Sequence, residues 1–273
     1  MSLLERTKHA LRNNRIVPNK LLGQNFTVDE EIFERLSEHV SLSEEDVALD
    51  IGAGLGFLTR FLAERCSQVL AVESDPNLVR ILHERLADLG NVNVIQGNIL
   101  KLDISGFNKI VSIPPYQISS RLMLWLFGKH LDSAVMVFQK EFANRLVASV
   151  GSEDYGWLTV LSYFYLECEL FEEVPRTSFF PQPEIDSTIV RLLPRREPPF
   201  DVSNRDSFTK LIRSLFTQRN RKVRNAVHPF LKSVLARTAE DAQMITRSLP
   251  FRDQRVRQLA PEDFGELLNA LAS

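Results

Sequence analysis

Residues that build metal centres and disulfide frameworks are scarce in this sequence. It has two cysteines, Cys66 and Cys168, and five histidines among 273 residues. The cysteines form no C-x-x-C pair, and His83, His130 and His228 are isolated from one another and from either cysteine. This spacing indicates neither a metal site nor a disulfide. We expect both cysteines to fill the core of a protein in a reducing cytoplasm.

Long hydrophobic runs are also absent. No apolar stretch approaches the roughly twenty residues that a membrane-spanning helix needs. The N-terminal MSLLERTKHALRNNR has no apolar core of the kind found in signal peptides. Hydrophobic residues make up 44% of the chain and charged residues 25%, as in ordinary globular proteins. These values predict a cytoplasmic protein with no membrane partner, built from one large domain or from one domain and a smaller one.

The net charge of −2 conceals two regions of opposite sign. Arg191–Arg257 contains 16 lysines and arginines but 6 aspartates and glutamates, a balance of +10, which leaves −12 for the rest of the chain. This asymmetry predicts a surface for nucleic-acid phosphates, and the alternative is a set of solvated helix faces. The residues we assign to such contacts are Arg219, Arg221, Lys222 and Arg224.

Residues 1–22 are a second basic segment, in which five lysines and arginines, Lys20 among them, oppose Glu5 alone. We expect a partly helical N-terminal arm. Such arms are mobile unless they are docked, and a phosphate partner could order this one.

The stretch Val47–Gly56, VALDIGAGLG, has the strongest pattern in the chain. Its apolar start predicts a buried strand, and the amphipathic Phe57–Arg65 that follows predicts a helix. A glycine-rich turn between strand and helix indicates nucleotide binding, because glycine lets the backbone approach a ligand closely. The alternative is a tight turn that binds no ligand. The glycines concerned are Gly52, Gly54 and Gly56.

Acidic residues favour one class of ligand for this turn. The pattern is D-x-G-x-G-x-G, not the G-x-G-x-x-G that holds a pyrophosphate on a helix N-terminus. Asp50 would repel a pyrophosphate but suits an ammonium group, which points to S-adenosylmethionine. Glu73 follows the next strand, Gln68–Val72, where an acidic residue can hold ribose hydroxyls. We assign Ser74 to the same cofactor site.

Alternating strands and helices predict a parallel sheet covered on both faces, with ligands beyond the carboxyl ends of its strands. The strand Val92–Ile95 leads to Gly97, Asn98 and Ile99, and the Asn98 amide could pair with an adenine ring. Ser112, which ends the fourth strand, is assigned to the same rim, where it could supply a hydroxyl. Further along, Leu158–Glu169 predicts a buried strand, and a proline-rich linker at 194–201 precedes short helices.

The segment Ile113–Tyr116, Ile-Pro-Pro-Tyr, follows the fourth strand. Pro114 and Pro115 hold the chain extended and remove two backbone donors, which leaves neighbouring carbonyls free to accept hydrogen bonds. Tyr116 offers a flat ring that suits an extruded base. The alternative is a rigid turn with a packed tyrosine.

Seven motifs occur in order along nearly the whole chain: Gly23–Phe26, Asp50–Gly56 with Glu73, Gly97–Asn98, Pro115–Ser119, Gln139–Leu146, Phe179–Ser187 and the basic Gln218–Asn225. Together they resemble the small-subunit ribosomal RNA adenine N6,N6-dimethyltransferase family, and Gln139–Ala143 is similar to archaeal and eukaryotic members. The resemblance implies a Rossmann-like class I methyltransferase domain at 23–194, with a mostly parallel seven-stranded sheet. It also implies a small all-helical RNA-binding domain at 202–273.

The resemblance implies an enzyme that uses S-adenosylmethionine to dimethylate N6 of two adjacent adenosines in small-subunit rRNA during ribosome biogenesis. Its partner would be the small ribosomal subunit, and we expect a monomer. Gln24, Asn25 and Phe26 would border the methionine end of the cofactor. Tyr116 and Phe179 would sandwich the target adenine, although Phe179 could instead fill the core.

Two positions depart from the family pattern. Ile113 replaces an Asn that accepts a hydrogen bond from adenine N6, and Asn98 replaces an Asp but keeps an acceptor. The Pro114 carbonyl would remain as an acceptor, so catalysis would rest on positioning by the loop. The alternative is a weak or inactive rRNA-binding assembly factor that retains the fold. A target in large-subunit rRNA or DNA is a third reading.

Overall fold

The computed structural model describes residues 1–19, 23–236 and 238–272, and the chain forms two compact units. The first joins Met1–Ala143 to Cys168–Pro194, and the second joins Asn144–Glu167 to Arg195–Ser273. These units differ from the expected domains, because the N-terminal segment clusters with the first unit and residues 144–167 cluster with the C-terminal helices. In the described ranges, no helix is long and apolar enough to cross a membrane. Nor do three or more His, Cys, Asp or Glu side chains group there as a metal site would require.

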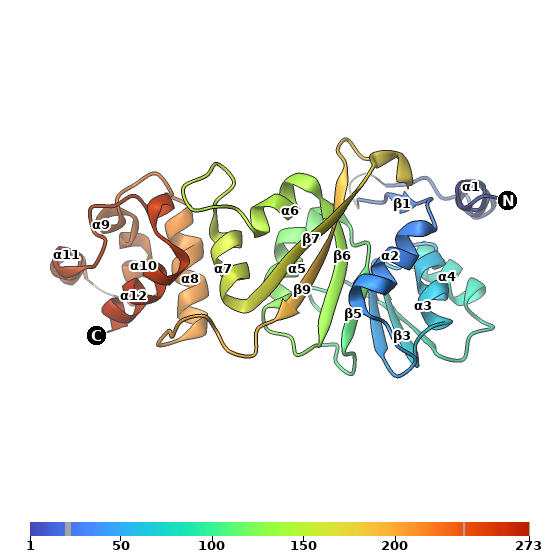
Figure 1. Cartoon of the computed structure of the whole chain (residues 1–273), viewed down its shortest axis with the longest axis horizontal. Helices are drawn as coiled ribbons and strands as arrows, with labels where there is room; N and C mark the ends of the chain where they lie inside the picture. The colour runs from blue at the N-terminus through green and yellow to red at the C-terminus, as the bar shows by residue number, and fades with distance from the viewer. Residues whose placement is uncertain (20–22, 237, 273) are drawn as a thin grey trace. The chain divides into compact units, whose positions relative to one another are not determined.

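The centre of the first unit is a seven-stranded sheet (Figure 1). Its strands are β2 (Val47–Ile51), β3 (Gln68–Glu73), β4 (Val92–Gln96), β5 (Lys109–Ser112), β6 (Ser133–Gln139), β7 (Leu166–Val174) and β9 (Ser187–Pro194). The order is β4-β3-β2-β5-β6-β9-β7; the neighbours from β4 to β6 are parallel, and β9 runs antiparallel to β6. The predicted Rossmann-like, mostly parallel sheet is confirmed.

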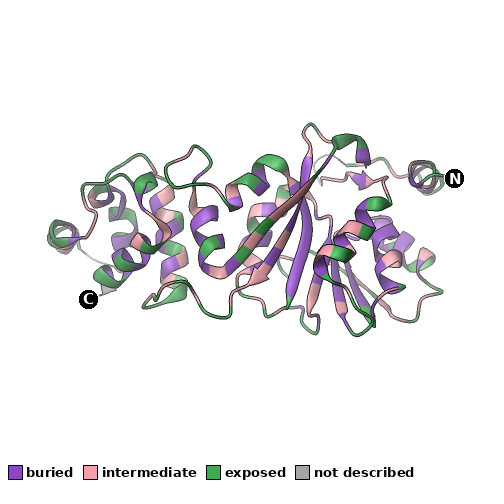
Figure 2. Cartoon of the chain, viewed as in Figure 1, coloured by how far each residue is buried: buried purple, intermediate pink, exposed green. Residues whose placement is uncertain are grey.

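Helices between the strands bury apolar faces against the sheet. α2 (Glu31–Val40) packs on β5 and β6, α3 (Phe57–Ala63) on β2 and β3, and α4 (Pro76–Arg85) on β3 and β4. Figure 2 shows the inner strands of the sheet as almost wholly buried. The other elements here are α5 (Ser119–Leu126), α6 (Lys140–Leu146), which continues into the second unit, η2 (Tyr116–Ile118) and η3 (Arg176–Ser178).

The expected N-terminal arm contains a docked helix, α1 (Leu3–Asn13), which belongs to the first unit. Its apolar side chains recur at helical spacing and anchor it without a phosphate partner. The Lys8 ammonium lies 5.2 Å from the centre of the Phe180 ring. Lys20 lies outside the described residues. The buried residues of α1 are Leu3, Thr7, Ala10 and Leu11.

The second unit is largely helical, and a helix lies where the sequence predicted part of a strand. Where a strand was expected over Leu158–Glu169, α7 (Trp157–Tyr165) leads directly into β7. Hydrophobic content alone does not separate a buried strand from a buried helix, and most of α7 is buried. The remaining helices are α8 (Arg205–Phe216), α9 (Val223–Ala226), α10 (His228–Ser233), α11 (Ala239–Ser248), η4 (Val256–Gln258) and α12 (Pro261–Ala272).

Candidate active site

The glycine turn after β2 has the backbone conformation that its motif predicts. Gly52 and Gly54 have φ angles of +78° and +58°, in the left-handed region that favours glycine. A Cβ at Gly52 would lie 2.8 Å from Cδ of Pro115, and one at Gly54 would lie 3.2 Å from the Phe26 ring. The turn therefore lies directly against the proline loop and against Phe26.

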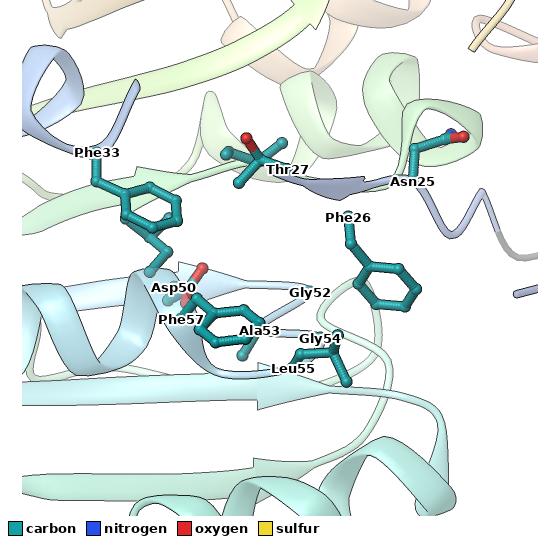
Figure 3. A pocket seen from close by; sticks show the side chains of 12 residues that line it. Asn25, Phe26, Thr27, Phe33, Asp50, Gly52, Ala53, Gly54, Leu55 and Phe57 are labelled. Carbon is teal, nitrogen blue, oxygen red and sulfur yellow. The ribbon is translucent and has the colours of Figure 1, made fainter. Parts of the chain in front are cut away.

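Two cavities meet at this turn. We name them the Asp50 cavity, which Phe33 and Phe57 also line, and the Glu73 cavity. Figure 3 shows Phe26 extending from its strand toward Gly54, while the amide of Asn25 points away from Asp50. The cavities thus bring three of the seven motifs together. The residues that line both are Asn25, Phe26, Gly52, Gly54 and Ile113, and those that line the Glu73 cavity alone include Gln24, Ser74, Pro114, Pro115 and Tyr116.

Asp50 is a buried carboxylate near the end of β2. It is 2% exposed, and Thr59 Oγ1 donates a 2.7 Å hydrogen bond to its Oδ2. Burial raises the pKa of Asp50 to about 7; the hydrogen bond from Thr59 lowers this pKa, and the charge of Glu73 raises it. Among the described residues Asp50 forms no ion pair. A cation in the Asp50 cavity would compensate its charge.

Glu73, the last residue of β3, is surrounded by backbone donors. Its Oε2 accepts a hydrogen bond from Gly54 N at 3.0 Å. Its Oε1 accepts from Ser74 N at 2.7 Å and from Asp75 N at 2.9 Å. These bonds tie the glycine turn to β3 and hold the carboxylate at the cavity wall, where its remaining lone pairs suit sugar hydroxyls.

The segment that carries Gln24 and Phe26 is fixed at two points. Gln24 Nε2 donates to Asp75 Oδ2 at 2.9 Å. Further on, β1 (Phe26–Thr27) pairs antiparallel with β8 (Phe179–Phe180). Asp75 is absent from the sequence prediction. An Asp before a proline at a helix start is nevertheless a capping signal. The Oδ1 of Asp75 indeed accepts a hydrogen bond from Asn77 N.

The proline loop forms the apolar side of the site. Ile113 lines both cavities, and its side chain can accept no hydrogen bond. The hydroxyls of Tyr116 and Ser187 share a 2.7 Å hydrogen bond. Burial raises the pKa of Tyr116 to about 12, while the bond to Ser187 lowers it, so the phenol is neutral at pH 7. Ser187 was part of a motif but was not predicted as a site residue.

The position of Phe179 differs from the one expected for an adenine sandwich. It is 2% exposed, because β8 pairs with β1, and it lines neither cavity. Its ring meets that of Tyr116 edge to face, with centroids 6.4 Å apart and an interplanar angle of 74°. A slot with two parallel faces is therefore not formed in this structure, and Tyr116 alone of the two rings reaches the Glu73 cavity.

Ser112 also differs from its predicted role. Its Oγ donates to Ile51 O at 2.7 Å and accepts from Ile51 N at 3.1 Å. The side chain is fully buried and joins β5 to β2. Its hydroxyl is therefore used within the sheet and is not available at the rim.

Four more of the predicted cofactor residues line neither cavity: Gly56, Gly97, Asn98 and Ile99. A Cβ at Gly56 would meet Leu82 of α4 at 2.8 Å, so this glycine serves helix packing. Asn98 Oδ1 accepts a hydrogen bond from Leu100 N within its own turn. The cofactor contacts expected of these residues, including that of Asn98 with an adenine ring, remain predictions.

The four basic residues assigned to phosphates lie in the second unit, and the Arg219 side chain binds backbone carbonyls of another segment of that unit. Arg219 donates to the carbonyls of Ser152 and Glu153 at 2.9 and 2.8 Å. It therefore holds the loop before α7. Arg221 and Lys222 are exposed, and Arg224 is partly exposed.

The fold adds basic residues that the sequence prediction did not single out. Lys222 forms an antiparallel bridge with Arg255, which brings residues 252–257 beside residues 219–224. Asp253 forms ion pairs with Lys222, Arg224 and Arg252. One carboxylate thus gathers three cations, and the surface stays positive. Only the fold reveals this pairing, since the two segments are far apart in the sequence.

Known proteins resemble this chain over most of its length. Residues 17–270 match the family model for "Ribosomal RNA adenine dimethylase". A protein of Methanosarcina acetivorans named "Probable ribosomal RNA small subunit methyltransferase A" is 37% identical over 250 residues, which are 91% of this chain and 91% of that protein.

Solved structures also resemble this chain over most of its length. The 23S rRNA methyltransferase ErmE matches with a TM-score of 0.63 at 29% identity, covering 91% of this chain and 100% of ErmE. A dimethyladenosine transferase from Plasmodium falciparum has a TM-score of 0.75, over 90% of this chain and 97% of its own. Its identity is 24%, so it bears on the fold alone. The chain belongs to the ribosomal RNA adenine dimethylase family.

Proposed function

We propose that this protein transfers methyl groups from S-adenosylmethionine to N6 of two adjacent adenosines in small-subunit rRNA. The observation that carries the proposal is that Gly52, Glu73, Pro115 and Tyr116 line one cavity, so that a cofactor turn meets a base-binding loop. Family membership and the name of the Methanosarcina relative support the reaction and the target. We further propose that the protein acts as a cytoplasmic monomer on immature small subunits.

The residues present fit S-adenosylmethionine. Asp50 would hold its ammonium group, Glu73 its ribose hydroxyls, and the backbone at Gly52 and Gly54 the part between. The burial of Asp50 without an ion pair among the described residues supports a cationic ligand. When bound, this cofactor supplies an electrophilic methyl group on a sulfonium.

The contribution of the chain to catalysis is positioning. Adenine N6 is a weak nucleophile because its lone pair is delocalised into the ring, and an acceptor for the N–H makes that pair available. The Ile113 side chain offers no acceptor and the Tyr116 hydroxyl is bound to Ser187, so we assign this task to the Pro114 carbonyl. No strong base is needed, because the proton leaves after the methyl group is transferred. The loss of one positioned hydrogen bond typically costs about 10²–10³ in rate, so we expect a slow enzyme.

We propose that both units contact rRNA through its phosphates. In the second unit the contacts would come from Arg221, Lys222, Arg224 and the adjoining residues 252–257. In the first unit, α1 exposes Arg12 and is followed by the exposed Arg15. Such contacts position a folded RNA largely by its shape.

A second candidate function is an assembly factor that binds rRNA without chemistry, and Ile113 is the observation that favours it. The two functions differ in what Ile113→Asn does. If wild-type protein transfers no methyl group and the variant does, the assembly factor is favoured. Measurable transfer by the wild-type protein excludes it.

The experiment incubates purified protein and S-adenosylmethionine with small subunits from cells that lack the modification, and analyses the rRNA by mass spectrometry. We expect two adjacent dimethylated adenosines. Large subunits in a parallel reaction control for a target like that of ErmE. Absence of methyl transfer to the small subunits would contradict the proposal.

A further inference from the structure

Ser187 occupies a position that the sheet fixes closely. It is the first residue of β9, fully buried, and paired in antiparallel register with Gln139 of β6. The preceding residue, Asp186, is anchored twice. Its carbonyl accepts from Lys140 N at 3.0 Å, and its carboxylate accepts from Arg176 N at 2.8 Å. The Ser187 hydroxyl therefore projects from a rigid backbone.

Tyr116, in contrast, lies in a single short turn, η2, directly after two prolines. Its ring is held from outside that turn, at two places. The hydroxyl shares the 2.7 Å bond with Ser187, and the ring contacts Phe179 edge to face. Both partners belong to the segment 179–187. The orientation of the ring at the Glu73 cavity thus depends on that segment.

The hydrogen bond restricts the motion that would spoil a stacking surface. A tyrosine ring turns broadly about its χ2 bond and swings about χ1. Fixing the hydroxyl restricts the swing and keeps the ring in the lining of the Glu73 cavity. The phenol stays protonated at neutral pH, so it does not act as a base for the N6 proton.

We propose that Ser187 is a positioning residue, which orients Tyr116 so that its ring can receive the target base. This inference rests on the proposed function, because it needs a base at Tyr116. The serine acts through the tyrosine hydroxyl alone. Removing either hydroxyl should therefore have the same effect, and removing both should add nothing.

The test compares Ser187→Ala, Tyr116→Phe and the double variant on undermethylated small subunits. A net hydrogen bond of this kind corresponds to roughly 2- to 12-fold. We expect each single variant, and the double variant, to lower kcat/KM by that factor, with the dissociation constant of S-adenosylmethionine unchanged. Ser133→Ala is the matched control, because Ser133 is also a buried serine at the start of a strand of this sheet. Losses that multiply in the double variant, or no loss in Ser187→Ala, would overturn the proposal.

A second readout does not depend on methyl transfer. Protein labelled with 3-fluorotyrosine has four tyrosines, and the ¹⁹F signal missing from Tyr116→Phe identifies Tyr116. We expect Ser187→Ala to shift or broaden that signal and Ser133→Ala to leave it unchanged. An unchanged signal in Ser187→Ala would overturn the proposal even in an active enzyme. Wild-type protein that transfers no methyl group would overturn the proposed function instead, and the ¹⁹F signal would then decide whether Ser187 orients the ring.

Discussion

The cofactor side and the substrate side of the site use their polar groups differently. On the cofactor side, Glu73 is bound by three backbone N–H groups and Asp50 is left with one hydroxyl donor. On the substrate side, Ile113 is apolar and the one hydroxyl of the loop, on Tyr116, is bound to Ser187. We therefore expect this protein to bind the cofactor normally but to transfer the methyl group slowly.

The largest effect should come from restoring an acceptor on the substrate side. Ile113→Asn places an amide oxygen at the wall that both cavities share. We expect the rate of methyl transfer at saturating cofactor to rise about 10²–10³-fold, because one positioned hydrogen bond is regained. Single-turnover kinetics measures it, with Ile113→Val as the apolar control. If Ile113→Asn bound the cofactor more tightly but transferred the methyl group at an unchanged rate, Ile113 would belong to the cofactor side of the site and not to the substrate side.

On the cofactor side, Asp50→Asn should weaken binding of S-adenosylmethionine by about 2 kcal/mol, roughly 30-fold, because a hydrogen-bonded charge is lost. Isothermal titration calorimetry measures the dissociation constant. Asp206→Asn, the same change at an exposed position of α8, should leave it unaltered. If the two variants bind the cofactor equally well, Asp50 does not hold it.

The pH dependence of cofactor binding should follow the same carboxylate. Since the pKa of Asp50 is raised from 3.8 to about 7, this carboxyl is protonated below pH 7 in the cofactor-free protein. A cation prefers the ionised form, so affinity should rise up to about tenfold per pH unit as the pH increases toward 7, and then level.

The stability of the protein measured without cofactor should show the opposite trend. Because folding raises the pKa of Asp50, its contribution to the free energy of unfolding is fully present below pH 3.8. This contribution is lost as the pH rises through 7. Titration and thermal unfolding between pH 5 and 8 check both trends. Asp50→Asn should remove both, and a pH dependence that persists in this variant would assign it to another group.

The smallest effect concerns the basic surface of the second unit. Arg221→Ala should lower the salt dependence of RNA binding by about one counterion. Arg219→Ala should instead loosen the loop at Ser152 and Glu153, with a lower melting temperature and an unchanged salt slope. Filter binding over a salt series separates the two. Equal slopes for Arg221→Ala and wild type would remove Arg221 from the RNA surface.

The sequence predicts those parts of the site that are local. Strand, glycine turn and helix are neighbours in the chain, so Asp50, Gly52 and Gly54 are recognisable from their order. Glu73 is found because parallel strands end at one rim. The same rule does not hold for Ser112, whose side chain forms hydrogen bonds between β5 and β2.

The remaining features depend on contacts that no local pattern encodes. The pairing of β1 with β8 buries Phe179, and the register of β9 brings Ser187 to Tyr116. Likewise, the bridge between Lys222 and Arg255 joins two basic segments from distant parts of the chain. Asp75 alone had a local signal, its place before a proline at a helix start.

The division between an intact cofactor side and a slow substrate side can be measured by single-turnover methyl transfer to undermethylated small subunits. Wild type and Ile113→Asn are compared side by side at saturating S-adenosylmethionine. We expect equal cofactor dissociation constants, slow but complete dimethylation of two adjacent adenosines by the wild-type protein, and faster dimethylation by the variant. A wild-type protein that binds the cofactor yet leaves both adenosines unmethylated would contradict this expectation.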